Sequence, residues 1–159
     1  MDGRTYRFFK GEPLFPFGHG LSYTRFEYSG LDVPPRLDVG APLRVSVAVK
    51  NAGARDGDEV VQFYLTHLDA RTRVPIRSLQ GVKRLRLAAG EQQTVSFTLE
   101  PKQLAIVNDA GQVRVEPGRL RISVGGKQPG FQGTADAATT QVVTAETELT
   151  GLAAITLVP

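Results

Sequence analysis

The sequence contains no cysteine and no tryptophan, and it has only two histidines among its 159 residues. Without cysteine the chain cannot form disulfides, use a catalytic thiol or bind a metal through thiolates, although its cellular compartment stays open. The histidines, His19 and His67, have no companion ligands nearby in the sequence, so we expect no zinc site. No phosphate-binding loop or nucleophile elbow occurs, and Gly18-His19-Gly20 lacks the remainder of a dinucleotide fingerprint. We therefore expect no cofactor and no catalytic metal.

Long hydrophobic runs are also missing. No stretch of about 18 apolar residues is present, so we expect no membrane-spanning helix and no membrane partner. Residues 1–10 carry charges throughout and lack the apolar region of a secretion signal. This absence assigns no compartment, because the targeting signal of a longer parent protein would lie upstream. The net charge of +3 is mild and permits an acidic partner without requiring one.

What the sequence does contain is a series of short runs in which apolar and polar residues alternate. In residues 43–50 every second side chain is Leu or Val, which is typical of a strand with one buried and one solvated face. Short strands at this spacing, almost without helix, predict an all-β fold, a two-sheet antiparallel sandwich of the immunoglobulin or fibronectin type III-like kind. The missing Cys…Trp…Cys signature favours the fibronectin type III-like variant. We expect further strands at 23–28, 60–65, 82–87 (with a bulge), 94–99, 119–124 and 141–149, a terminal pairing at Ile155 and Leu157, a helical turn at 101–104 and a hairpin around 108–111.

An extended aromatic segment precedes the first expected strand. Residues 13–22 are rich in proline and glycine, which prevents a regular helix or sheet, yet they are too apolar for a free linker. Exposed rings cost free energy in water, so we expect another surface, most simply a neighbouring domain, to cover them. We therefore divide the chain into a linker and docking segment at residues 1–22 and a sandwich at residues 23–159, with a mobile loop at residues 125–138. The docking residues expected in this segment are Leu14, Phe15, Phe17, His19 and Leu21.

Several motifs, in the same order along the chain, resemble one known family. The run Phe15-Pro16-Phe17-Gly18-His19-Gly20-Leu21-Ser22-Tyr23-Thr24 is similar to the segment that leads into the C-terminal fibronectin type III-like domain of family 3 glycoside hydrolases. The match continues through Val49-Lys50-Asn51-Ala52-Gly53 and Asp58-Glu59-Val60-Val61-Gln62-Phe63-Tyr64. It extends to Leu79-Gln80-Gly81-Val82-Lys83-Arg84 and Leu87-Ala88-Ala89-Gly90-Glu91, where Val82 stands in place of the family's phenylalanine.

The resemblance implies a non-catalytic C-terminal accessory domain of a β-glucosidase or β-xylosidase. The parent enzyme would hydrolyse terminal non-reducing β-D-glycosyl residues with retention and without a cofactor, and would be periplasmic or extracellular. The domain's partners would be the preceding catalytic domains of the same parent chain, which it would dock on and stabilise. Arg77 falls in the family's Pro-x-Arg-x-Leu-x-Gly pattern, whose expected use is docking against those domains.

The only tight acidic cluster is formed by Asp56, Asp58 and Glu59. Glycoside hydrolysis needs two carboxylates flanking a sugar. These three lie in a turn feeding a strand, where acids commonly cap and solvate the backbone. The family's nucleophile and acid/base belong to earlier domains, so we predict no catalytic residue in this chain.

Two binding functions remain as alternatives. A carbohydrate-binding module would need exposed aromatic platforms, and Tyr64 is the possible sugar platform because the alternation places it on the outer face of its strand. A polyanion-binding module could use the basic run from Arg71 to Arg86. That run lacks interleaved stacking aromatics, so we expect no nucleic-acid partner.

Overall fold

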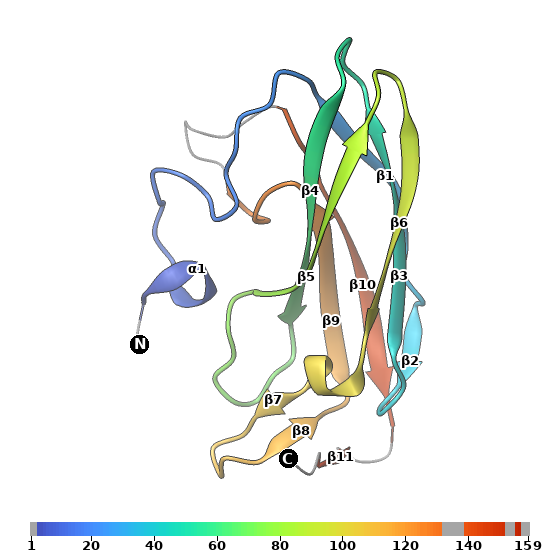
Figure 1. Ribbon diagram of the computed structural model, residues 1–159. Helices are drawn as coiled ribbons and strands as arrows, with labels where there is room; N and C mark the ends of the chain where they lie inside the picture. The colour runs from blue at the N-terminus through green and yellow to red at the C-terminus, as the bar shows by residue number, and fades with distance from the viewer. Residues whose placement is uncertain (1–2, 132–138, 152–154, 157–159) are drawn as a thin grey trace.

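The computed structural model describes residues 3–131, 139–151 and 155–156, and these residues form a β-sandwich (Figure 1). One sheet has the strand order β1-β3-β6, and the facing sheet has the order β2-β10-β9-β4-β5, so that β5 is an edge strand. A small third sheet, in the order β11-β8-β7, lies at one end of the sandwich. All neighbouring strands are antiparallel except β2, which pairs with β10 in parallel. The predicted all-β, two-sheet sandwich is confirmed.

The elements have the following bounds. They are α1 (Thr5–Phe8), β1 (Phe26–Asp32), β2 (Arg36–Asp38), β3 (Leu43–Asn51), β4 (Gly57–His67), β5 (Ser78–Leu87), β6 (Gln92–Leu99), the 3-10 turn η1 (Pro101–Leu104), β7 (Ile106–Val107), β8 (Val113–Val115), β9 (Gly118–Gly125), β10 (Val142–Thr150) and β11 (Ile155–Thr156).

The core lies between the two sheets and is formed by the apolar side of each alternating strand. In β4 the side chains of Val61, Phe63 and Leu65 are buried, and in the facing sheet β3 and β6 bury every second residue. The rings of Phe63 and Phe97 meet across the interior with centroids 5.2 Å apart. Two-residue periodicity was therefore sufficient to identify the interior, because each strand has one buried face.

Two details of the expected strands are wrong. The first strand begins at Phe26 instead of Tyr23, whose ring is 96% exposed. The bulge expected in 82–87 is absent, since that half of β5 pairs regularly with β4, and the register shifts instead between Gly81 and Leu79. A Cβ on Gly81 would lie 2.9 Å from the Phe97 ring, so the strand passes close to the core at the point where its pairing shifts.

The other expected elements are present where the structure describes them. The helical turn at 101–104, the hairpin around 108–111 and the long strand β10 are confirmed, and Ile155 pairs with Val115. Leu157 and residues 132–138 of the expected mobile loop lie outside the described residues. The division of the chain at residues 22 and 23 stays a prediction.

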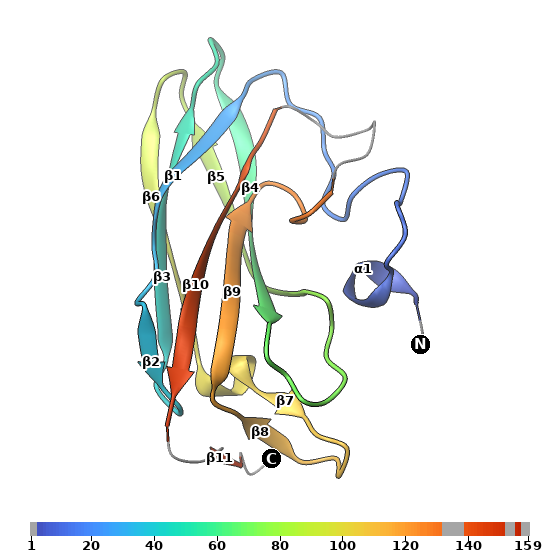
Figure 2. The ribbon, with the colours of Figure 1, turned by 180° about the vertical axis from the view of Figure 1, so that it is seen from behind.

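The N-terminal segment lies outside the sandwich. Figures 1 and 2 both place α1 and the chain that follows it beside the outer face of the five-stranded sheet, away from β3 and β6. Within the described ranges, no helix is long and apolar enough to span a membrane.

Candidate docking surface

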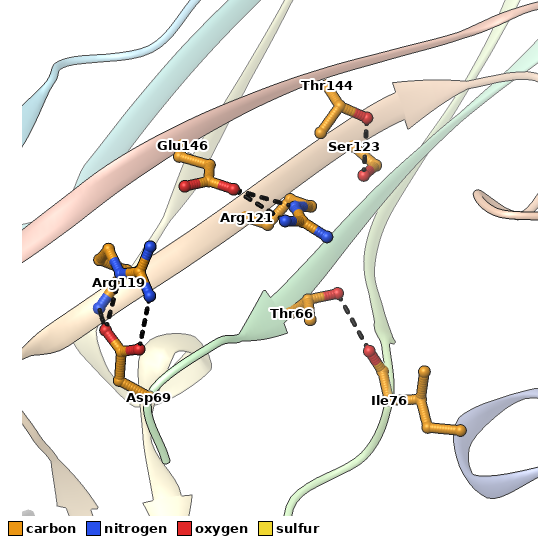
Figure 3. Close-up of polar contacts among 8 residues, drawn as sticks. All are labelled: Thr66, Asp69, Ile76, Arg119, Arg121, Ser123, Thr144 and Glu146. Carbon is orange, nitrogen blue, oxygen red and sulfur yellow. Dashed lines mark hydrogen bonds and ion pairs between the residues drawn. The ribbon is translucent and has the colours of Figure 1, made fainter.

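The outer face of the five-stranded sheet is divided into a covered part and a solvated part. On β4, the outward side chains of Gln62 and Tyr64 are 4% and 0% exposed, although alternation directs them away from the core. Further along the face, β9 and β10 place polar side chains opposite each other, among them Arg121 and Glu146 (Figure 3). The difference arises because the N-terminal segment lies over only one part of the sheet.

The solvated part contains two ion pairs, one between β9 and the loop after β4 and one between β9 and β10. The Arg119 guanidinium donates two hydrogen bonds of 3.0 Å to Asp69, and Arg121 donates to Glu146 (Figure 3). These side chains are 41–59% exposed, so each pair contributes little to stability. In these pairs each charged side chain has an opposite charge beside it.

Aromatic rings form the covered part. The Tyr6 ring stacks on Phe17 with centroids 4.3 Å apart and meets Tyr64 edge-on at 6.2 Å. Burial in this layer raises the pKa of the Tyr64 hydroxyl. The prediction that Tyr64 is an exposed sugar platform is therefore wrong. Its outward direction was correct, but Tyr6 and its own strand neighbours remove the ring from solvent.

Amide side chains fix the segment to the sheet. The Gln128 side chain accepts a hydrogen bond from the Phe17 backbone N–H at 3.1 Å, and the Gln128 N–H donates to the Phe17 carbonyl at 3.2 Å. Gln62 donates to the Gly18 carbonyl at 3.4 Å and accepts from the Tyr64 hydroxyl at 2.5 Å. Gly18 has φ +78°, and a Cβ there would collide with the Gln62 amide, so only glycine fits this contact. Residues 16–18 are thus hydrogen-bonded to β4 and to the loop after β9.

A second set of contacts holds α1 to the loop that precedes β5. The Ile76 N–H donates to the Arg7 carbonyl at 2.7 Å, and the Leu79 N–H donates to the Tyr6 hydroxyl at 3.2 Å. The Arg73 guanidinium lies 5.5 Å from the centre of the Phe8 ring, within the range of a cation–π contact. The segment is therefore attached at two points, one on each side of the aromatic stack.

The same segment leaves several apolar side chains in solvent. Leu14 is 85% exposed, Phe15 60%, Leu21 88% and Tyr23 96%. Three of these, Leu14, Phe15 and Leu21, are predicted docking residues. Phe17, also predicted, is 44% exposed and uses its other side on Tyr6. The predicted docking residues thus fall into two groups. Phe17 is packed on Tyr6, whereas Leu14, Phe15 and Leu21 are mostly exposed to solvent.

His19, another predicted docking residue, lies between these groups. Its ring is 5.0 Å from that of Phe15, and its backbone N–H donates to the Pro16 carbonyl at 3.0 Å. Its Nδ1 atom is buried and has no hydrogen-bond partner in the part of the chain that the structure describes. His67 is the last residue of β4. Burial lowers its pKa to about 4, so it is neutral at pH 7. The two imidazoles are not brought together.

Between the N-terminal segment and the loops at residues 76–77 and 128–131 there is a hollow of about 780 Å³. Aromatic rings of the segment and Phe131 line it, and Lys10, Glu12, Arg77 and Gln128 supply charged and polar groups. Arg77 is half-buried, and this burial lowers the pKa of its guanidinium while the nearby Tyr64 hydroxyl opposes the change. Its predicted place at the docking surface stays a prediction, but it does adjoin the aromatic segment.

The acidic cluster does not form a pair of convergent carboxylates. Asp56 accepts a hydrogen bond from the Ala89 N–H, and Asp58 accepts one from Arg84 at 2.6 Å, which lowers its pKa. Glu59 points the other way, into the sandwich. Each acid therefore has a separate structural partner. Among the described residues, no group of three or more His, Cys, Asp or Glu side chains could hold a metal ion.

Sequence reasoning missed Glu59 as a buried residue. It is 7% exposed, and its Oε1 accepts hydrogen bonds from the Tyr28 hydroxyl at 2.6 Å and from the Thr140 hydroxyl at 2.5 Å. Burial raises the pKa of its carboxyl above the ordinary value, although both hydroxyls favour the charged form. The signal was available, because Glu59 has the same parity along β4 as the buried Val61 and Phe63.

The basic run from Arg71 to Arg86 is not one surface. Arg84 pairs with Asp58, and Lys83 donates to the Ser96 carbonyl and lies over the Phe97 ring. Arg71 and Arg73 instead lie on the loop beside α1. The run is thus divided between the edge strand β5 and the loop before it, which lies beside α1.

Comparison with known proteins gives one consistent relationship. A model for the fibronectin type III-like domain matches residues 59–128. Over 127 residues the chain is 42% identical to thermostable beta-glucosidase B of Acetivibrio thermocellus, and over 125 residues it is 45% identical to a beta-xylosidase of Formosa agariphila. Each match covers 76% of this chain but only 17% of the relative. The chain thus spans about a sixth of the length of these curated relatives.

Solved structures agree with this relationship. A beta-glucosidase from Listeria innocua in complex with glucose matches 88% of this chain with a TM-score of 0.76 and 33% sequence identity, and the match covers 18% of the Listeria chain. The described sandwich therefore corresponds to one part of a much larger protein.

Proposed function

Because the chain is a fibronectin type III-like domain homologous to part of the β-glucosidases and β-xylosidases of glycoside hydrolase family 3, we propose that it is an accessory domain of such an enzyme. It docks on the preceding catalytic domains of the same parent chain and stabilises them. The chain itself supplies no catalytic residue. Small displacements of a supporting layer reduce catalysis at a distance, which gives such a domain a function without chemistry of its own.

The observation that carries this proposal is the exposure of apolar side chains on a segment that is otherwise fixed in place. Leu14, Phe15, Leu21 and Tyr23 are exposed, while residues 16–18 between them are hydrogen-bonded to the sheet. A flexible tail could fold its apolar groups away from water, but a segment fixed on both sides cannot. Clustered exposed apolar groups on a folded domain indicate an interaction surface.

The activity proposed for the parent is based on what the relatives are named for. We propose that the parent removes terminal non-reducing β-linked glucose or xylose with retention, and that it acts in the periplasm or outside the cell. The relatives include both a beta-glucosidase and a beta-xylosidase at similar identity, so both sugars belong to the proposal.

The proposal is tested by binding and by activity. The wild-type chain should bind the polypeptide that precedes it in its parent, measured by isothermal titration calorimetry, and Leu21→Ser with Tyr23→Ser should weaken that binding at least tenfold. Val107→Ser is the matched control, because Val107 is 57% exposed but lies on the β7–β8 hairpin. The chain alone should not hydrolyse aryl β-glucosides or β-xylosides. Turnover that Asp58→Ala abolishes would overturn the accessory assignment, as would equal binding by the double variant and the wild type.

The burial of Tyr64 argues against the carbohydrate-binding alternative, because this ring was expected to form the sugar platform. Retardation of the chain on cellulose or xylan affinity gels, lost on Tyr23→Ala, would restore it.

A further inference from the structure

Arg77 has a charge that nothing in the described part of the chain balances. It makes no ion pair there, although Arg84, Arg119 and Arg121 all do. Glu12 is the one carboxylate among the described residues that line the hollow, and it forms no ion pair with Arg77; the neighbouring Tyr64 hydroxyl is neutral at pH 7. Partial burial of a guanidinium costs hydration free energy, and this cost is not offset when no carboxylate pairs with the group.

The surface around the hollow has the same sign of charge. In residues 3–17 and 70–78, which α1 and the loop before β5 bring side by side, Glu12 is the only acidic residue. The basic residues in these ranges are Arg4, Arg7, Lys10, Arg71, Arg73 and Arg77. This concentration contrasts with the mild net charge of +3 for the whole chain. The face therefore attracts an acidic partner in particular.

The hollow and the exposed rings form one continuous footprint. Phe15 lines the hollow and is 60% exposed, and Phe9 lines it and is 41% exposed. A small ligand inside the hollow would leave the outer sides of these rings in water. A polypeptide loop can fill the hollow and cover its rim together.

On this basis we infer that the hollow receives a loop of the preceding catalytic domain, and that an Asp or Glu on that loop pairs its carboxylate with the Arg77 guanidinium. Apolar side chains that flank the acid pack on Phe9 and Phe15. This inference rests on the proposed function and assigns the chemistry of the partner surface. It makes Arg77 the specific contact of the interface, with Leu21 and Tyr23 contributing apolar area elsewhere.

The test compares Arg77→Gln with Arg71→Gln in binding to the polypeptide that precedes the chain in its parent. Arg71 is the matched control, because it carries the same charge on the same loop but is exposed. Arg77→Gln should weaken binding about tenfold, a loss between those expected on breaking an exposed and a fully buried ion pair. Arg71→Gln should weaken binding less than about twofold. Arg77→Lys should fall between wild type and Arg77→Gln, because it keeps the charge but not the planar pair of donors. Circular dichroism confirms that each variant is folded.

A second step identifies the carboxylate. Asp and Glu residues of the upstream polypeptide are changed singly to Asn and Gln, and one of these changes should abolish the difference between wild type and Arg77→Gln. Equal losses for Arg71→Gln and Arg77→Gln would show attraction by overall charge and would overturn the inference. If Leu21→Ser with Tyr23→Ser weakens binding but Arg77→Gln does not, docking stands and the acidic loop is wrong. If the wild-type chain does not bind, the proposed function and this inference fall together.

Discussion

The interior between the sheets and the layer over the outer face are both aromatic, but they are built differently. In the interior, Phe63 and Phe97 contact each other and are at most 7% exposed. In the outer layer, the Tyr6 and Phe17 ring centroids are 4.3 Å apart, closer than the 5.2 Å between Phe63 and Phe97, yet Phe17 is 44% exposed. The interior closes with apolar groups from two sheets, whereas the outer layer has one sheet beneath it and nothing above it among the described residues.

This difference shows which region can stand alone. The strand pairs and core of the sandwich account for its burial without help from outside. The outer layer depends on a few amide hydrogen bonds and one ring stack, and such a layer gains most of its remaining burial only when another surface covers it. Both regions are aromatic in the sequence, and only the structure separates them.

The largest effect should come from the interior. Phe63→Ala removes a fully buried ring and leaves a cavity, so the free energy of unfolding should fall by about 3–5 kcal/mol. Urea denaturation followed by circular dichroism measures the loss. A loss smaller than that of any outer-layer variant would contradict the view that the interior is the stabilising region.

A smaller effect is expected in the outer layer. Phe17→Ser loses a half-buried ring and its stack on Tyr6, so the chain should lose about 1–2 kcal/mol of unfolding free energy. The exposed Leu21 provides the control, because Leu21→Ser should change stability by less than about 0.5 kcal/mol. Equal losses in the two variants, measured by the same denaturation, would remove the distinction between the packed and the unpacked parts of the segment.

The subtlest effect concerns pH. Among the buried residues that the structure describes, Glu59 is the only acidic or basic one. Its pKa in the folded state is raised above 4.5. The folded state then binds the proton more tightly than the unfolded state. The resulting stabilisation is fully present below pH 4.5 and is lost as the pH rises through the folded pKa.

Glu59→Gln isolates this contribution. The stability of the wild type relative to Glu59→Gln should increase on acidification from pH 7 toward pH 4.5, by about 1.4 kcal/mol for each unit by which the pKa is raised. Denaturation of both proteins across this range checks the sign. A wild type that loses stability relative to the variant on acidification would show that the Tyr28 and Thr140 hydroxyls hold the carboxylate in its charged form.

Most of the sandwich was predictable because its information is local. Alternation in residues 43–50 and 119–124 identifies buried faces without reference to the rest of the chain. Turn residues likewise indicated the hairpin between β7 and β8. The start of β1 was misplaced because Tyr23 continues the aromatic pattern, although its side chain faces solvent.

The docking surface was only partly predictable, because its contacts join distant parts of the chain. Gln128 meets Phe17 across 111 positions, and a single glutamine in a loop has no periodic signal. The burial of Tyr64 could not be predicted for the same reason. The alternation in its own strand shows that the side chain points outward, but it does not show the segment that covers it. Composition indicated that the rings need a surface, but not that some of them already have one.

The place of β5 at the edge of its sheet has a further consequence. An open edge offers unpaired backbone groups to any other strand, including the same strand of a second copy. Lys83, Arg84 and Arg86 place like charges along this strand, so two copies brought edge to edge would repel each other. These positive charges therefore disfavour edge-to-edge pairing of two copies through β5.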